Sequence, residues 1–538
     1  MIPHRLRGFL FFIVAATLAI AFAWQGSLAS FGDDSASYLT LAHYFLPSSS
    51  AVVSQWARYH SNFPPLFPML LAITGGAQDL HVAYVLVASC AAIGTALFYR
   101  YAVLAQGERT GLVVAVSFLL TATAWVSLKG VLSESLFLLV SMAALLFHEM
   151  RIASRRPAVW EWLVFGVLLA CVALTRAIGI LLVAAYAMHL LVRLAGKEKP
   201  SRAALLPLVP VVVLLGLWYA LKPRASLDYY QYAVSWVIGR WLESPIDTLI
   251  DAARIFFDGW IRSFLADSEA TMAAKIVFAG LGLLAIAGAL VRTARNHLDG
   301  WFAILSLAVV FSWTFSPETT RRLLYPLIPL LILFAALAVR QALDATTLAG
   351  RRLLLAQVAL AALPMLLCLP AILAIQEKAL DRRTVIAGCP QAFREMTPYY
   401  TTLNIEGAEG LARLEVMMLC GLQSLDKVTP PGSVVMWTRP EYVALLGNRP
   451  AAAYHYGWAP RDLAMEIKRA KVDYLVVSLL NKNDLEGALP KPMKGMQEEA
   501  YAQTVFASTD NVFVVKKIDR AALESFLRRQ ESRGRSGA

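Results

Sequence analysis

The chain has 538 residues, of which 58% are hydrophobic and only 16% carry a charge, and its formal net charge is +12. This composition excludes an ordinary soluble protein, which is roughly half apolar and about a quarter charged, and it indicates a membrane protein. The positive charge does not indicate nucleic-acid binding, because Lys and Arg concentrate in short loops between apolar runs, as the positive-inside rule predicts.

About eleven apolar runs are long enough to cross roughly 30 Å of hydrocarbon as helices. Several have indistinct ends, so the sequence supports about ten to twelve transmembrane helices. They are placed at residues 7–24, 80–101, 111–127, 132–149, 160–175, 178–195, 203–221, 273–292, 300–315, 323–341 and 353–375. The first run has the basic start of a signal peptide and is followed by a small-x-small triplet, but its length favours an uncleaved helix.

The short loops alternate between a basic set and a set poor in basic residues. Arg58 is the only Lys or Arg between positions 25 and 79. The positive-inside rule therefore predicts a cytoplasmic N-terminus, with residues 25–79, 222–272 and 376–538 outside. In a bacterial cell this describes a multi-pass protein of the inner membrane.

The first outer loop, residues 25–79, contains the stretch GDDSASYLTLAHYF with the adjacent acids Asp33 and Asp34. One explanation is helix capping, in which Asp34 or Ser35 accepts amide hydrogens of the first turn. A rigid helix start is also a suitable place for a reactive carboxylate. Both explanations stay open on the sequence alone.

The second outer loop, residues 222–272, has aromatic and aliphatic residues at three- and four-residue spacing between charges, which predicts helices on the bilayer surface. After residue 375, turn signals separate short strand and helix patterns. They predict a small α/β domain over residues 376–525 and a basic, disordered tail over 526–538. Cys389 and Cys420 fall in this outer region, where a disulfide can persist, and the sequence does not decide whether they pair.

Charged residues that a bilayer disfavours gather on the predicted outer side. Arg176 lies between two apolar runs with almost no loop, so it either faces a cavity or partner, or reaches the outer surface. Arg321 and Arg322 open another run where the positive-inside rule does not place arginines. Glu134 begins a run on the same side, as a helix-start acid or a site residue. Guanidinium groups bind phosphate oxygens well, so this placement indicates an anionic ligand.

Carboxylates and arginines on one side of the membrane suit sugar transfer from a lipid-linked phosphate. The acid removes a proton from an acceptor hydroxyl, and the arginines stabilise charge on the departing phosphate. Arg58 and His60, in the first outer loop, are candidate substrate-binding residues, although a lone histidine is usually structural. No His or Cys spacing indicates zinc, whereas Asp33 and Asp34 leave a divalent metal ion open.

The order of these features resembles the GT-C superfamily of integral-membrane glycosyltransferases, within the group of lipid A aminoarabinose transferases and protein O-mannosyltransferases. Each motif is modest alone, but five in the right order on one side are fairly specific. They are Asp34-Ser35-Ala36-Ser37-Tyr38, NFPPLFPMLLA (62–72), LSESLFLLVSMAALLF (132–147), ALTRAIGILL (173–182) and RRLLYPLIPLLILFAAL (321–337). The resemblance covers residues 1–375, a transmembrane catalytic module to which the outer α/β domain is appended.

The resemblance implies a polyprenyl-phosphate sugar donor, an inverting transfer, and a lipid, glycan or protein acceptor. It also implies a catalytic acid in the first outer loop. On the family's acid-acid-x-x-Tyr pattern, Asp34 matches the leading acid and Tyr38 the aromatic residue, while Ser35 replaces the second acid. Asp34 is therefore the favoured base, and Asp33, one place earlier, is the alternative.

Some relatives have a lysine before the prolines of the second motif for phosphate binding. This chain has Asn62-Phe63 there, so the resemblance assigns phosphate binding to Arg176, Arg321 or Arg322. A transporter or lipid flippase is the alternative function, but such proteins usually show repeated halves with broken helices near mid-membrane, and no repeat is found. A non-catalytic scaffold would leave the outer arginines without a use.

Overall fold

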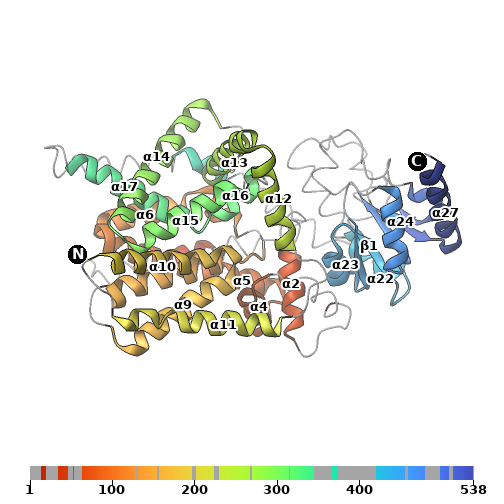
Figure 1. Ribbon diagram of the computed structural model, residues 1–538, viewed down its shortest axis with the longest axis horizontal. Helices are drawn as coiled ribbons and strands as arrows, with labels where there is room; N and C mark the ends of the chain where they lie inside the picture. Colours follow the sequence, from red (N-terminus) through yellow and green to blue (C-terminus); the bar gives the residue numbers. More distant parts are fainter. Residues whose placement is uncertain are drawn as a thin grey trace. The chain divides into compact units, whose positions relative to one another are not determined.

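The computed structural model forms two compact units (Figure 1), one of residues 1–26 and 61–377 and the other of residues 27–60 and 378–538. Each unit is treated by itself. The structure describes residues 12, 14–19, 34–46, 53, 63–128, 130–153, 157–196, 201–222, 229–266, 270–313, 316–344, 366–373, 375, 420–454, 459–478, 497–507 and 513–536.

The first unit is helical wherever elements are described. Its main helices are α4 (Leu66–Thr74), α5 (Leu80–Gln106), α6 (Glu108–Leu119), α7 (Ala122–Val126), α8 (Glu134–Phe147), α9 (Val159–Thr175), α10 (Ile180–Ala195), α11 (Leu208–Leu221), α12 (Tyr229–Glu243), α13 (Pro245–Leu265), α14 (Met272–Ala294), α15 (Leu298–Ser312), α16 (Pro317–Leu324) and α17 (Ile328–Asp344). Short helical segments η2 (His148–Ala153), η3 (Ala177–Gly179) and η4 (Arg202–Leu205) extend or precede three of them.

Within the described residues, five helical segments are long and apolar enough to cross a membrane. They are Leu80–Gln106, Glu134–Ala153, Ala177–Ala195, Arg202–Leu221 and Met272–Ala294, and the bent pair α16–α17 would make a sixth. The prediction of a polytopic helical membrane protein is confirmed. The total of about eleven spans stays a prediction, because most of the runs at 7–24 and 353–375 lie outside the described residues.

The expected run over residues 111–127 is not one helix. Helix α6 ends at Leu119 and α7 begins at Ala122. The Thr121 hydroxyl donates to the Phe118 carbonyl at 2.7 Å, and the Trp125 indole N–H donates to the Leu119 carbonyl at 2.6 Å. Side chains thus satisfy carbonyl groups that lose their helical partners at the break.

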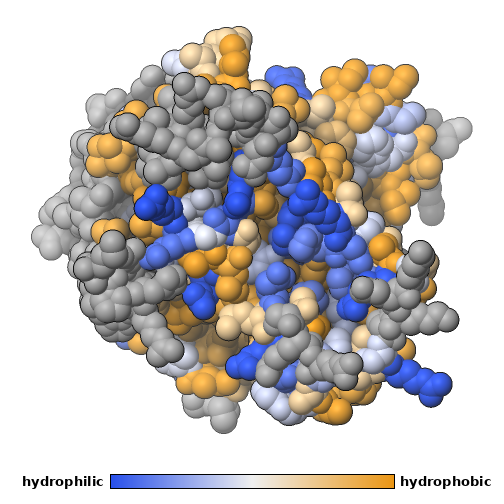
Figure 2. Space-filling model, turned by 90° about the vertical axis from the view of Figure 1, so that its left-hand side faces the viewer, coloured by the Kyte–Doolittle hydropathy of each residue, from blue (hydrophilic) through white to orange (hydrophobic). Residues whose placement is uncertain are grey.

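Charged helix ends meet at one end of the first unit. Arg340 of α17 donates to the Gln106 side chain of α5 at 3.1 Å, and Arg292 of α14 donates to the Tyr101 hydroxyl of α5 at 3.4 Å. Hydrophilic side chains gather between hydrophobic ones on the face seen in Figure 2. Arg292 and Arg340 belong to the loops and helix ends predicted to be cytoplasmic, whereas Glu134 starts α8 at the end opposite η2.

The second outer loop contains the two predicted helices, α12 and α13. Helix α13 packs on α16 at Gly259, where an added Cβ would lie 2.6 Å from the Cβ of Thr320. The Trp260 indole N–H donates to the Phe278 carbonyl of α14 at 2.7 Å, and the rings of Phe264 and Phe278 stack. Glycine at 259 therefore lets α13 approach α16 closely, while α14 holds α13 in place.

The second unit contains a five-stranded mixed sheet in the order β2-β1-β3-β5-β4. Strand β1 is parallel to β2 and β3, whereas β5 is antiparallel to β3 and β4. The elements are α2 (Ser35–Tyr44), α22 (Leu425–Val428), β1 (Val435–Trp437), α23 (Pro440–Gly447), β2 (Ala451–Ala453), α24 (Pro460–Arg469), β3 (Tyr474–Ser478), η5 (Glu498–Ala500), β4 (Ala502–Ala507), β5 (Phe513–Ile518) and α27 (Arg520–Ser536). The predicted α/β pattern, with its final hairpin, is confirmed.

The C-terminal residues differ from the expectation of a disordered tail from residue 526. Helix α27 runs to Ser536, and its side chains Leu523, Phe526 and Leu527 are buried. Their three- and four-residue spacing forms an apolar stripe, and the Phe526 ring packs on Tyr501 with centroids 5.2 Å apart. The arginines that follow this stripe, at 528, 529, 533 and 535, give the end of the chain the composition of a solvated basic tail.

Cys420 is disulfide-bonded, whereas Cys90, Cys171 and Cys368 are free. Its expected partner, Cys389, lies outside the described residues. We expect a non-reducing peptide map of the purified protein to contain one cross-linked peptide joining positions 389 and 420, because both belong to the unit predicted to face an oxidising compartment. Alkylation of Cys420 without prior reduction would contradict this pairing.

Candidate active site

A buried carboxylate in the first unit binds arginines from two distant parts of the chain. Glu134 Oε1 accepts hydrogen bonds from Arg176 Nη1 at 2.8 Å and from Arg322 Nε at 2.9 Å. The Glu134 side chain is 1% exposed, against 13% for Arg176 and 20% for Arg322. Arg176 Nη1 also donates to the Ser133 hydroxyl at 3.3 Å. Three of the predicted site residues are thus in direct contact.

A sharp turn between two helices positions Arg176. Helix α9 ends at Thr175, and Arg176 has an extended backbone with φ −147° and ψ 145°. Helix η3 follows at once, and Gly179 lies so close to the Val172 carbonyl that an added Cβ would be 2.2 Å from its oxygen. Only glycine fits this close approach, so the chain reverses with almost no loop. The guanidinium group therefore extends from the junction of α9 and α10.

Helix α16 carries Arg321 and Arg322 in a short segment with clear boundaries. The Ser316 hydroxyl caps its N-terminus by accepting from the Thr319 amide at 3.1 Å, and Pro317 occupies the first turn. After α16 the chain bends by 73° into α17, at a break that contains Pro326, which cannot donate a helical hydrogen bond. Arg321 is buried and pairs with Glu318, while Arg322 reaches Glu134.

Arg262 of α13 joins this cluster, although the sequence analysis did not single it out. Its charge and that of Arg322 both act on Arg321. Its Nε atom is buried and has no hydrogen-bond partner among the described residues. In the sequence, Gly259 and Arg262 lie three residues apart, on one face of α13. This spacing points to the cluster only when the structure shows that Gly259 packs against Thr320 of α16.

The arginine cluster, defined as Arg176, Arg262, Arg321 and Arg322, gathers four guanidinium groups. Glu134 pairs with Arg176 and Arg322, and Glu318 pairs with Arg321. Guanidinium groups bind phosphate and carboxylate groups strongly. The arrangement is therefore chemically suited to an anion. The described residues contain no His, Cys, Asp or Glu group able to hold a metal ion.

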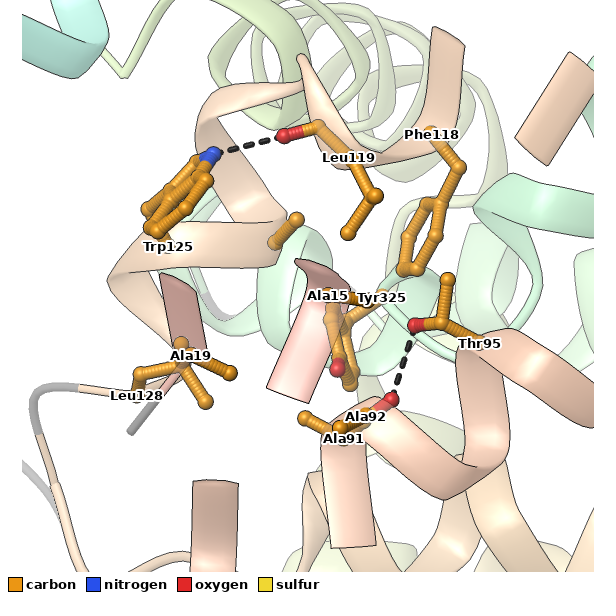
Figure 3. A pocket seen from close by; sticks show the side chains of 11 residues that line it. Ala15, Ala19, Ala91, Ala92, Thr95, Phe118, Leu119, Trp125, Leu128 and Tyr325 are labelled. Atoms are coloured by element: carbon orange, nitrogen blue, oxygen red, sulfur yellow. Dashed lines mark hydrogen bonds between the residues drawn. The ribbon is translucent and has the colours of Figure 1, made fainter. Parts of the chain in front are cut away.

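An apolar pocket lies beside Tyr325, at the bend between α16 and α17 (Figure 3). The space free of protein atoms here is about 320 Å³, part of which is open to the outside. The residues around it include Ala91, Ala92, Phe118, Leu119, Trp125 and Tyr325. The Thr95 hydroxyl and the Trp125 indole N–H at its wall donate to backbone carbonyls, so the pocket offers hydrocarbon surface. Tyr325 follows Arg322 by three residues, about one helical turn, so the pocket lies beside the arginine cluster.

Asp34 and Tyr38 belong to the second unit, at the start of α2. The Asp34 carbonyl accepts from the Tyr38 amide at 2.9 Å, as expected at a helix N-cap. Its side chain, however, makes no capping hydrogen bond among the described residues, so capping does not account for the carboxylate. Tyr38 is buried. The remaining predicted site residues, Asp33, Arg58 and His60, lie outside the described residues.

No protein-family model matches the sequence, and neither does any curated protein. Among solved structures, ArnT from Cupriavidus metallidurans in the apo state is similar, with a TM-score of 0.54 and 13% identity over 95% of this chain and 98% of that chain. ArnT bound to undecaprenyl phosphate gives a TM-score of 0.53 and 14% identity over the same shares. At 13% and 14% sequence identity, these similarities show a shared fold and nothing further. The chain therefore shares its fold with ArnT.

Proposed function

We propose that this protein is a glycosyltransferase that moves a monosaccharide from a polyprenyl-phosphate donor to an acceptor hydroxyl outside the cytoplasm. The observation that carries the proposal is the arginine cluster beside an apolar pocket in a membrane protein of GT-C fold. ArnT was solved with undecaprenyl phosphate, a ligand that combines a phosphate with a hydrocarbon chain. A polyprenyl-phosphate donor likewise has a phosphate, which suits the arginine cluster, and a hydrocarbon chain, which suits the apolar pocket.

The arginine cluster binds the donor phosphate and stabilises it as it leaves. A sugar–phosphate diester carries one negative charge, whereas the released phosphate monoester carries about 1.5 to 2 at neutral pH. Negative charge therefore grows next to Arg176, Arg262 and Arg322 as the sugar–phosphate bond breaks. Interactions that strengthen during the reaction lower its barrier, so guanidinium groups beside the departing phosphate favour transfer more than donor binding.

Glu134 acts as a positioning residue for two arginines. It is buried, and its Oε1 atom already accepts from Arg176 and Arg322. A carboxylate engaged in this way holds both guanidinium planes in one arrangement, which suits binding of a phosphate more than proton removal. The sequence left Glu134 as either a helix-start acid or a site residue, and this role combines the two.

Asp34 acts as the general base. It takes the proton of the acceptor hydroxyl while that oxygen attacks the anomeric carbon, and the bond from this carbon to the phosphate oxygen breaks. Attack opposite the leaving group inverts the anomeric configuration. Tyr38, Arg58 and His60 contact the substrates, and Asp33 is the alternative base. The N-terminus is cytoplasmic and the α/β domain extracytoplasmic, so the acceptor is a lipid, glycan or protein of the cell envelope.

The apolar pocket beside Tyr325 takes the first isoprene units of the donor, and Ala91→Phe tests this. We expect the larger ring to fill the space and to raise the KM for the lipid-linked donor by about tenfold, with kcat changed by less than about twofold, because ground-state binding alone is affected. Leu104→Phe, at an exposed position of the same helix, is the control. An unchanged donor KM for Ala91→Phe would show that this pocket does not bind the donor.

The function itself is tested by reconstituting the full chain in lipid vesicles with a radiolabelled polyprenyl-phosphate sugar and an extract of envelope acceptors. We expect label to move from the donor to an acceptor. Mass spectrometry of envelope glycolipids and glycoproteins from cells with and without the gene should then reveal one missing sugar unit. Lipid flipping in the same vesicles without any sugar transfer would contradict the proposal and favour a flippase.

A further inference from the structure

The helix that begins at Asp34 is folded as part of the C-terminal α/β domain. Although α2 and α23 are almost 400 residues apart in the sequence, α2 packs against α23 in the second unit (Figure 1). Ala36, two residues after Asp34, is fully buried and belongs to the same hydrophobic core as Trp437 and Tyr442. From the sequence, in contrast, we expected this helix to belong with the transmembrane module.

Helix α23 is buried on more than one side. Tyr442 belongs to the sheet core, and Ala444 lies two residues later, about 200° around the helix. Ala444 and Glu441, three residues apart on this second side, are also buried. Since α2 packs against α23, it is the candidate to cover the side that carries Ala444.

The domain is built to hold such a helix firmly. In the chain order β1–α23–β2–α24–β3, strand β2 lies on one side of β1 and β3 on the other. Right-handed crossovers then place α23 and α24 on opposite faces of the sheet, and Figure 1 shows them on either side of β1. Helix α27 packs on α24. A rigid sheet therefore supports α23, and α23 in turn supports the residues that follow Asp34.

We infer that the α/β domain positions the Asp34 carboxylate through the α2–α23 contact, with Ala444 as the positioning residue. The inference rests on the proposed function, because Asp34 matters only as the base. It gives the C-terminal domain a direct part in the reaction, beyond that of an appended module. A base must be held closely in place, and a displacement of about 1 Å in a reacting group lowers the rate by about a hundredfold.

The test uses the same substitution on the two faces of the sheet, in the full chain. Ala444→Leu adds bulk on the side of α23 that the inference assigns to the α2 contact, and Ala464→Leu adds it at a fully buried position of α24, on the opposite face. We expect Ala444→Leu to speed hydrogen exchange of the α2 amides by about tenfold and to lower kcat by about a hundredfold, with donor KM within about twofold. Ala464→Leu should leave α2 exchange and kcat within about threefold of the parent.

The hydrogen-exchange measurement and the activity measurement test separate claims. Unchanged exchange in α2 for Ala444→Leu, or equal losses of kcat for both variants, would overturn the inference. If the parent protein transfers no sugar, the proposed function fails, yet the exchange measurement still decides whether α23 holds α2. Should Ala444→Leu not fold, Ala444→Val adds less volume at the same position and is expected to give a smaller change in the same direction.

Discussion

Asp34→Asn is expected to lower sugar transfer by roughly a hundredfold to ten-thousandfold, which is the usual contribution of a general base. Asparagine has nearly the same shape but cannot take a proton at this step. The Asp34 side chain makes no capping hydrogen bond among the described residues, so the substitution should leave α2 folded. Donor binding should also be preserved, because the arginine cluster is unchanged. Single-turnover transfer, thermal unfolding and donor binding of the purified variant measure these three properties.

Asp33→Asn is the matched control for this prediction. If Asp34 is the base, Asp33→Asn keeps most of the activity and Asp34→Asn also loses the acidic limb of the pH–rate profile, since no carboxylate then needs to be ionised. The reverse pattern would assign the base to Asp33. Full activity in both variants would mean that neither acid removes the proton.

Glu134→Gln should have the second largest effect, for a different reason. Two guanidinium groups lose their shared carboxylate, so the arrangement that binds phosphate is no longer held. We expect transfer to fall by about a hundredfold. Removing one partner of a buried ion pair costs about 3–5 kcal/mol, and we expect about 1–3 kcal/mol of unfolding free energy here, because Arg176 and Arg322 are partly exposed.

The pH–rate profile separates this role from proton transfer. A positioning residue changes the rate at every pH, so Glu134→Gln should keep the acidic limb that Asp34→Asn loses. Ser133→Ala is the control, because it removes a 3.3 Å hydrogen bond to Arg176 but leaves the carboxylate in place. Loss of the acidic limb in Glu134→Gln would identify Glu134 as the base. Unchanged transfer would show that the pairing with the arginines does not serve the reaction.

The sequence could predict that several charged residues lie on the same side of the membrane, but not which of them touch. Loop charges place Glu134, Arg176 and Arg322 on one side, since the positive-inside rule depends on loops and not on packing. Arg322 and Glu134 are in contact although they are 188 residues apart. Their contact depends on the bend at Pro326 and on the turn at Gly179, and the sequence does not show in which direction these redirect the chain. Arg262 was missed for the same reason. The nearby Gly259 indicates a close helix contact only when α16 is seen to pack against it.

The α/β domain was predictable strand by strand because its turns and periodicity are local signals. The sequence did not show, however, which distant segments of the chain pack into this domain. Helix α2 precedes most of the first unit in the chain and packs on α23, and no periodicity in residues 35–44 shows which partner buries them. Similarly, Leu523, Phe526 and Leu527 of α27 form an apolar stripe whose partner, Tyr501, comes from elsewhere in the sequence.

Cryo-electron microscopy of the full chain in lipid nanodiscs with undecaprenyl phosphate would show where the donor phosphate binds. We predict density for the phosphate within about 3 Å of the Arg176 and Arg322 guanidinium groups, with the chain entering the pocket beside Tyr325. Arg262 should contribute a donor as well. A phosphate bound away from these arginines, or a lipid that leaves the cluster empty, would contradict the account.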